Sequence, residues 1–97
     1  MNKPPVRVGN WTFLSNHAHV LLCLAKDQSL RIRDLAQEVG ITERAVQRIL
    51  SELAEEGYIE IEKEGRRNIY KVLNGKPLKH PIEWHKNIED LIQLIFD

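Results

Sequence analysis

The sequence predicts one small, mainly α-helical domain that carries a single β-hairpin. Apolar residues recur at spacings of three and four through residues 15–56 and again near the end of the chain, as they do on one face of a helix. Between these regions lie two segments of alternating apolar and polar residues, separated by a short polar turn. A length of 97 residues matches a single domain.

The overall charge gives no simple sign of a partner. Hydrophobic residues make up 42% of the chain and charged residues 29%, both ordinary for a globular domain. The 14 basic and 14 acidic residues leave a formal net charge of zero, so the chain is not the strongly basic protein that most readily binds nucleic acid. Any nucleic-acid surface must therefore come from an uneven placement of charge.

Several functional classes have no support in the sequence. The single cysteine, Cys23, excludes an internal disulfide and a Cys-x-x-Cys zinc pair, and it favours a reducing, cytoplasmic setting. The glycines form neither a phosphate-binding loop nor a nucleotide fingerprint, and no serine has a Gly-x-Ser-x-Gly setting. The longest apolar run, residues 20–25, is far shorter than the ~20 residues of a membrane span. We expect no enzymatic activity, no cofactor and no membrane partner.

The N-terminal part is expected to form an irregular arm and a central helix. Residues 1–10 contain two prolines and read as the arm. A helix is predicted over residues 15–26, with Ser15 or Asn16 as its N-cap. Its apolar stripe is wide enough for burial on most sides, and Trp11, Phe13 and Leu14 are expected to pack against the same core.

Two further helices follow in close succession. Apolar residues predict a helix over residues 32–39, ended by Gly40, because glycine readily adopts the left-handed conformation found at helix ends. Thr42 can cap the next helix, predicted over residues 43–56 and ended by Gly57.

The rest of the chain predicts a hairpin and a closing helix. Strands are expected at residues 58–63 and 68–72, with residues 64–67 as the turn, which places two arginines near the tip. A helix is expected over about residues 82–96, with one apolar stripe made of Trp84, Ile88, Leu91, Ile92 and Ile95.

The two middle helices have the pattern of a helix-turn-helix. Such a motif needs a small residue where the helices approach and a corner residue that tolerates positive φ, and Ala36 and Gly40 meet these needs. The apolar positions that would fix the crossing angle are Leu35, Val39, Ile41, Val46 and Ile49.

The exposed face of the predicted helix 43–56 carries chemistry suited to DNA. Arg44, Gln47, Arg48 and Ser51 are three or four residues apart and so share one face. Arginine binds guanine bidentately, glutamine binds adenine, and hydroxyl groups bind phosphates or base edges. The acidic residues of this helix cluster in its last turns, which point away from DNA in this docking mode.

The segment LRIRDLAQEVGITERAVQRILSELAEEGYIEIEKEGRRNIYKV, preceded by one helix and followed by another, resembles a winged helix-turn-helix transcriptional regulator of the MarR and ArsR type. The resemblance covers about residues 11–73 and implies a DNA-binding domain at residues 11–75. It implies that the second helix of the motif enters the major groove of double-stranded DNA and that the hairpin, the wing, contacts the backbone or minor groove. The residues expected to bind DNA are Thr42, Arg44, Gln47, Arg48, Ser51, Arg33, Lys63, Arg66 and Arg67.

Residues 76–97 are expected to mediate homodimerisation through the stripe of the closing helix, because exposed apolar patches usually mark a partner surface. The alternative is that this stripe packs on its own domain. An alternative for the whole chain is a winged helix that contacts protein within a larger assembly, since a fold alone does not fix function.

Two forms of control also stay open beside the DNA-binding interpretation. His80, His85 and Glu89 invite a metal site, with His85 and Glu89 on one face of the predicted helix, although two ligands do not close a site. Cys23 could sense oxidants only with an exposed thiol of low pKa, and it is more simply a small buried hydrophobic residue.

The zero net charge conceals a division along the chain. Residues 59–80 contain six basic and three acidic side chains, whereas residues 81–97 contain one basic and four acidic ones. The bases lie on the expected DNA side and the acids on the expected dimer side. This division predicts modest, steeply salt-dependent DNA binding.

Overall fold

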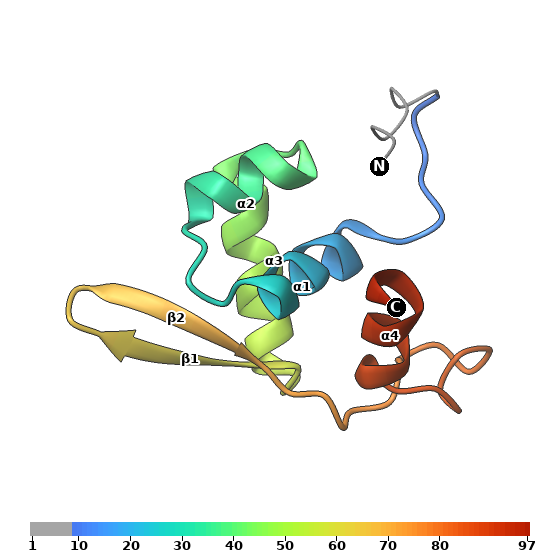
Figure 1. Cartoon of the computed structure of the whole chain (residues 1–97). Helices are drawn as coiled ribbons and strands as arrows, with labels where there is room; N and C mark the ends of the chain where they lie inside the picture. Colours follow the sequence, from blue (N-terminus) through green and yellow to red (C-terminus); the bar gives the residue numbers. More distant parts are fainter. Residues whose placement is uncertain (1–8) are drawn as a thin grey trace.

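The computed structural model describes residues 9–97, so all but the end of the expected N-terminal arm lies outside the described residues. Figure 1 shows three helices packed together, a hairpin projecting to one side and a fourth helix on the other. This architecture confirms the predicted mainly α-helical fold with one hairpin. The elements in chain order are α1 (Asn16–Lys26), α2 (Ile32–Val39), α3 (Glu43–Glu55), β1 (Ile59–Glu64), β2 (Arg67–Val72) and α4 (Ile88–Phe96).

One apolar core joins all of these elements. Its members from the three packed helices include Leu24 of α1, Leu35 of α2 and Ile49 of α3, each almost completely buried. The base of the hairpin adds Ile59, and α4 adds Ile88. Because each element contributes to the same core, α1, α2 and α3 are held in fixed positions relative to the hairpin.

The turn between α2 and α3 follows the predicted helix-turn-helix geometry. Gly40 ends α2 with φ of 82°, in the left-handed region, and its N–H donates to the Ala36 carbonyl. Thr42 then caps α3, because its hydroxyl oxygen accepts a 3.0 Å hydrogen bond from the Ala45 N–H. Helix α2 therefore has the predicted bounds, and α3 begins where the sequence predicts and ends at Glu55, one residue before the predicted end.

The hairpin is antiparallel and tighter than expected. Its register pairs Ile59 with Val72 and Glu64 with Arg67, which leaves only Gly65 and Arg66 in the turn. Gly65 has φ of 66°, a backbone conformation typical of two-residue hairpin turns. The predicted turn of residues 64–67 is thus too long by one residue on each side, and Arg67 belongs to β2.

Only the base of the hairpin is buried. Ile59 and Tyr70 are 2% and 4% exposed, whereas Ile61, two residues farther along β1 toward the tip, is 46% exposed. The backbone of β2 is also tied to the loop after α1, since the Tyr70 N–H donates to the Gln28 carbonyl over 3.3 Å. The outer half of the hairpin therefore projects into solvent from an anchored base (Figure 1).

The closing helix is shorter than the sequence predicts. It begins at Ile88 rather than near Ile82, because Asn87 and Asp90 cap its first turn with reciprocal 2.9 Å hydrogen bonds between side chain and backbone. The residues before it form a loop, closed where the Leu78 N–H donates to the Lys86 carbonyl over 2.8 Å. The apolar stripe predicted a helix through this loop because Trp84 has helical spacing to Ile88.

Four expected apolar positions need correction. Ile88 is 4% exposed within its own domain, which removes it from the proposed dimer stripe, and Trp84 lies in the loop rather than on α4. Trp11 and Phe13 do not pack on the core as expected: they are 67% and 93% exposed, and their rings contact each other edge to face. An edge-to-face contact between two aromatic rings is itself favourable, so this pair forms without reaching the core.

The left-handed turn at Gly40 predicts a specific loss of stability. A Gly40→Ala substitution meets no atom within 4 Å, so its cost is the backbone strain of a Cβ at positive φ, about 1–2 kcal/mol. Gly75→Ala is the matched control, because Gly75 also has open space around it but no positive φ. Urea unfolding followed by circular dichroism should show a lower midpoint for the first variant alone; equal midpoints would contradict the strain.

Candidate nucleic-acid interface

Helix α3 has one buried face and one exposed face. Val46, Ile49, Leu50 and Leu53 are buried in the core. The four residues predicted to face DNA from this helix, Arg44, Gln47, Arg48 and Ser51, are all exposed. The helix therefore presents guanidinium, amide and hydroxyl groups together on a surface that the core holds rigidly.

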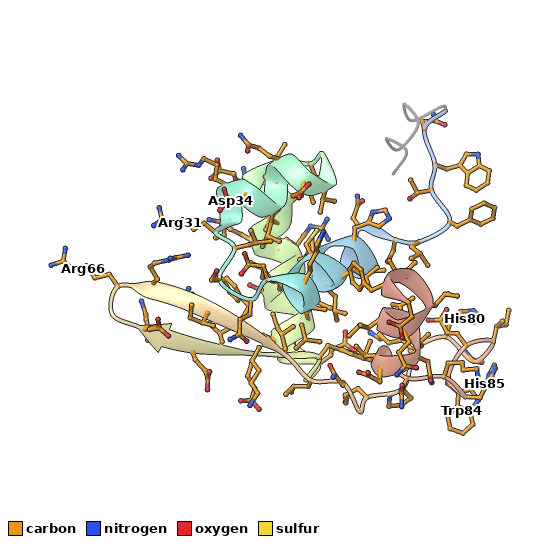
Figure 2. All side chains as sticks on the ribbon, in the orientation of Figure 1. Arg31, Asp34, Arg66, His80, Trp84 and His85 are labelled. Carbon is orange, nitrogen blue, oxygen red and sulfur yellow. The ribbon has the colours of Figure 1, made fainter. Side chains whose placement is uncertain are left out.

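The approach to α3 carries further polar groups. Thr42 is exposed at the N-terminus of α3, where its oxygen accepts the capping hydrogen bond and its hydroxyl hydrogen stays available to donate. Arg33 is exposed on α2. Arg31, exposed directly before α2, lies on the hairpin side of the molecule in Figure 2, and its backbone N–H donates to the Asp34 carboxylate over 3.1 Å.

The hairpin tip supplies a second basic region. Arg66 occupies the turn and extends into solvent at the far end of the molecule (Figure 2), and Lys63 is exposed on β1. Arg67 has a different setting from the one predicted: its guanidinium donates to the Ser29 carbonyl and so ties β2 to the loop between α1 and α2. We therefore assign Arg67 to anchoring the hairpin, because this contact occupies part of its fork.

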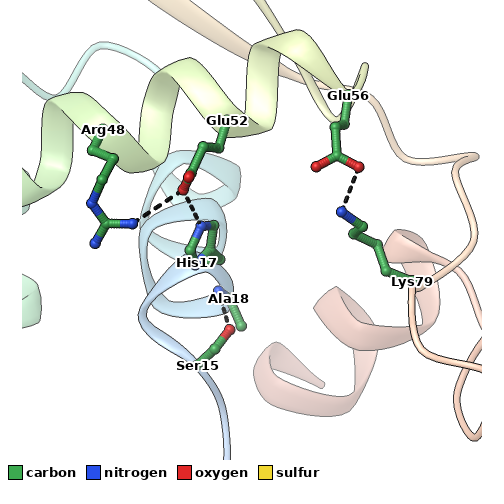
Figure 3. A network of polar contacts seen from close by, with 7 residues as sticks. All are labelled: Ser15, His17, Ala18, Arg48, Glu52, Glu56 and Lys79. Carbon is green, nitrogen blue, oxygen red and sulfur yellow. Dashed lines mark hydrogen bonds and ion pairs between the residues drawn. The ribbon is translucent and has the colours of Figure 1, made fainter.

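A carboxylate connects the exposed face of α3 to α1. One oxygen of Glu52, Oε1, lies 3.2 Å from Nη1 of Arg48 on the same helix and 2.7 Å from Nε2 of His17 on α1 (Figure 3). The hydrogen bond from His17 is the main reason that the pKa of Glu52 lies below its usual value, and the Arg48 charge acts in the same direction. Glu52 is consequently a charged group over the pH range in which histidines titrate.

Comparison with known proteins agrees with this geometry. Residues 16–60 match the sequence model that describes winged helix-turn-helix DNA-binding domains. That segment runs from the start of α1 to the start of β1 and contains both helices of the motif.

The described chain has the winged helix-turn-helix fold, with the matched residues 16–60 as its helices and the hairpin as its wing. The predicted fold and the predicted resemblance to winged helix-turn-helix regulators are thereby confirmed over this segment.

Two other comparisons complete these findings. Among solved structures, the chain is similar to the zinc-bound state of AdcR, described as a zinc-dependent MarR family transcriptional regulator, with 24% identity and a TM-score of 0.49. The match covers 70% of this chain and 49% of AdcR, so the chain spans about half the length of that regulator. No curated protein matches the sequence.

The winged helix-turn-helix domain does not bring the candidate metal ligands together. Within residues 9–97, no group of three or more His, Cys, Asp or Glu side chains lies close enough to hold a metal ion. His85 and Glu89 do not share a helical face as expected, because α4 begins at Ile88 and His85 lies in the preceding loop. His80 is engaged locally, since its Nδ1 accepts a 3.1 Å hydrogen bond from the Ile82 N–H.

Cys23 has the setting of a packing residue. Its side chain is half-buried beside the core of the domain, and burial is the main reason that the pKa of its thiol is raised, with the Glu38 charge adding to the effect. A raised pKa lowers the fraction of thiolate, which is the species that oxidants attack.

Among the described residues, no helix combines the length and apolar character needed to cross a membrane.

Arg31 stands with Arg33 among the basic groups of the motif and extends the basic surface, although it is outside the set of residues predicted to bind DNA. One contact of the domain was missed from the sequence. The contact between His17 and Glu52 joins residues 35 positions apart, and nothing in the local sequence pattern of either residue marks it.

Proposed function

We propose that this chain is a sequence-specific regulator of transcription that binds double-stranded DNA, with α3 in the major groove and the hairpin, the wing, on the backbone or minor groove. The observation that carries the proposal is the exposed face of α3, on which Arg44, Gln47 and Arg48 lie opposite the buried core residues. The match to winged helix-turn-helix DNA-binding domains over residues 16–60 supports it. The proposal is one of binding rather than catalysis, in the cytoplasm, with no cofactor.

The chemistry of this face suits base recognition better than charge attraction alone. Arg44 and Arg48 are four residues apart, about one helical turn, so both can reach the same groove. Gln47 lies between them and offers the donor and acceptor pair that reads adenine. Because the first turns of α3 carry these groups, an approach by its N-terminal half keeps Glu55 and Glu56 away from the phosphates.

The wing supplies contacts that do not depend on sequence. Arg66 and Lys63 lie on the outer half of a hairpin whose base is anchored to the domain. Their charges therefore extend beyond the helices on a hairpin that is held in place at its base. Arginine and lysine side chains bind phosphate oxygens of any sequence and fix the register of a protein on the duplex. The proposed DNA contact of α3 is bordered by four further exposed residues: Thr42, Ser51, Arg33 and Arg31.

We also propose that the regulator is a homodimer through the exposed side of α4. Leu94, Ile95 and Phe96 are 75%, 47% and 46% exposed at the end of this helix, and Leu91 and Ile92 are half-buried beside them. Apolar side chains grouped at one end of a small domain favour a self-complementary contact with a second copy. Two-fold symmetry would then require a pseudo-palindromic site with half-sites separated by whole helical turns of about 10–10.5 bp.

The groove assignment predicts a loss of sequence preference. An Arg44→Ala/Arg48→Ala variant should bind a selected DNA site at least about tenfold more weakly, because each bidentate base contact contributes about 1–3 kcal/mol. Fluorescence anisotropy with the selected site and with a scrambled duplex measures both affinity and preference. Lys86→Ala is the control: Lys86 is exposed and follows His85, which lies at the end of the molecule opposite Arg66 (Figure 2). Wild-type affinity and preference in the double variant would refute the assignment.

The wing assignment predicts a change in salt dependence. Arg66→Ala should weaken binding to all sequences alike and reduce the slope of log K against log salt by about 1, the loss of one phosphate contact. Arg67→Ala should change the slope less and instead lower the stability of the hairpin, because Arg67 donates to Ser29 within the domain. Affinity titrations at a series of salt concentrations, beside thermal melts, separate the two effects; equal slopes for the two variants would contradict the division of roles.

The dimer proposal is tested at the end of α4. Leu94→Glu/Ile95→Glu should convert a dimer to a monomer in sedimentation equilibrium, because burying two carboxylates in an apolar seam is strongly unfavourable. Gln93→Glu is the control, since Gln93 is an exposed polar residue on the same helix. A wild-type protein that sediments as a monomer at micromolar concentration would overturn this part of the proposal and leave DNA binding to be judged alone.

A further inference from the structure

One carboxylate oxygen of the domain is shared between the proposed DNA face and a histidine on another helix. Glu52 Oε1 accepts from Arg48 at 3.2 Å and from His17 at 2.7 Å (Figure 3). Arg48 is a residue of the proposed base contact, whereas His17 lies near the N-terminus of α1, on the other side of the carboxylate. The side chains of His17 and Glu52 are 42% and 45% exposed, so protons from solvent reach this contact.

The groups around this contact are few. From α3, the charged groups near His17 are Glu52, Arg48 and Glu56, and Glu56 is paired with Lys79 of the loop after the hairpin. His17 and Glu52 line a surface cavity of about 510 Å³. The loop after the hairpin contributes Lys79, His80 and Glu83 to its lining, and Tyr58, which follows α3, also lines it. Helix α4 contributes only Ile88 and Leu91, neither of which titrates. His17 and His80 are the histidines that line the cavity.

We propose that Glu52 is a positioning residue for Arg48 and that protonation of His17 releases Arg48 toward DNA, so that DNA affinity rises as pH falls. This inference rests on the proposed function. When His17 is neutral, the charge of Glu52 is balanced by Arg48, which holds the guanidinium back along α3. When His17 is protonated, its positive charge balances Glu52, and Arg48 is left to reach a base or phosphate.

The direction of the effect follows from linkage. In this scheme Arg48 is free to contact DNA only when His17 is protonated, so DNA binding favours the protonated state and takes up a proton. Affinity therefore increases as pH falls through the range in which a histidine titrates. Glu52 does not reverse this trend, because its lowered pKa keeps it ionised through the same range.

The test is the pH dependence of the dissociation constant for the selected DNA site, at constant salt. From about pH 8 to about pH 6 the wild-type protein should bind about threefold more tightly, as expected when binding is coupled to the uptake of part of one proton. His17→Gln should remove most of this change, because glutamine still donates to Glu52 but does not titrate. His19→Gln and His80→Gln are matched controls that should keep it, since His19 contacts Asn16 and His80 contacts Ile82.

A second variant tests the role of Glu52 separately. Glu52→Gln should bind more tightly than wild type at about pH 8 and should lose the pH dependence, because Arg48 is then released whether or not the histidine is charged. Glu55→Gln makes the same change of charge one turn along α3 and should keep the pH dependence, because Glu55 has no ion pair among residues 9–97.

The outcomes separate this inference from the proposed function. If the wild-type protein binds no DNA at any pH or salt concentration, the proposed function fails. If it binds DNA and His17→Gln keeps the wild-type pH dependence, or Glu55→Gln loses it as Glu52→Gln does, this inference is wrong and the DNA-binding proposal stands. Thermal melts of each variant confirm that the exposed substitutions leave the domain folded.

Discussion

The burial of one face of α3 is the constraint on which the rest of the structure depends. Val46, Ile49, Leu50 and Leu53 are covered by α1, α2 and the hairpin base, and this cover fixes how far α3 can rotate about its axis. A rotation of one residue, about 100°, would bring polar side chains into the core, where they would lack partners. The exposed face is consequently as well defined as the buried one, so the core sets the direction of Arg44 and Arg48 although neither belongs to it.

The same constraint explains why the sequence predicted the motif well and the chain ends poorly. The positions of α2 and α3 follow from local features of the sequence: the positive φ of Gly40, the cap at Thr42 and an apolar spacing that lets only one face of each helix be buried. At the C-terminus the apolar spacing extends through Trp84, but the reciprocal cap of Asn87 and Asp90 starts the helix later. A periodic pattern counts apolar residues and takes no account of a competing cap.

The candidate site divides in the same way. The exposed residues of α3 follow from helix geometry once the buried ones are known, so local periodicity was sufficient to place them. The roles of Arg67, which contacts Ser29 across 38 residues, and of His17, which contacts Glu52 across 35, depend on how separate elements pack. A charged residue in a hairpin turn and one in the adjacent strand position look the same in the sequence. Only the packed structure shows that Arg66 lies in the turn and that Arg67 lies in β2 and contacts Ser29.

The arrangement of charge gives the neutral chain a direction. The hairpin with Arg66 at its tip and the loop with His80, Trp84 and His85 lie at opposite ends of the molecule (Figure 2), and the net negative charge of the C-terminal part comes from Glu89, Asp90 and Asp97, in and after α4. An anionic duplex is attracted by the arginines of the hairpin tip and repelled by α4, so the field orients the domain before contact is made. The Glu52 carboxylate sits between these ends, paired with Arg48 on α3 and with His17 on α1. A neutral domain of this kind gains less binding free energy from non-specific attraction to DNA than a basic domain does. The release of Arg48 from Glu52 would therefore account for a larger share of its total binding free energy.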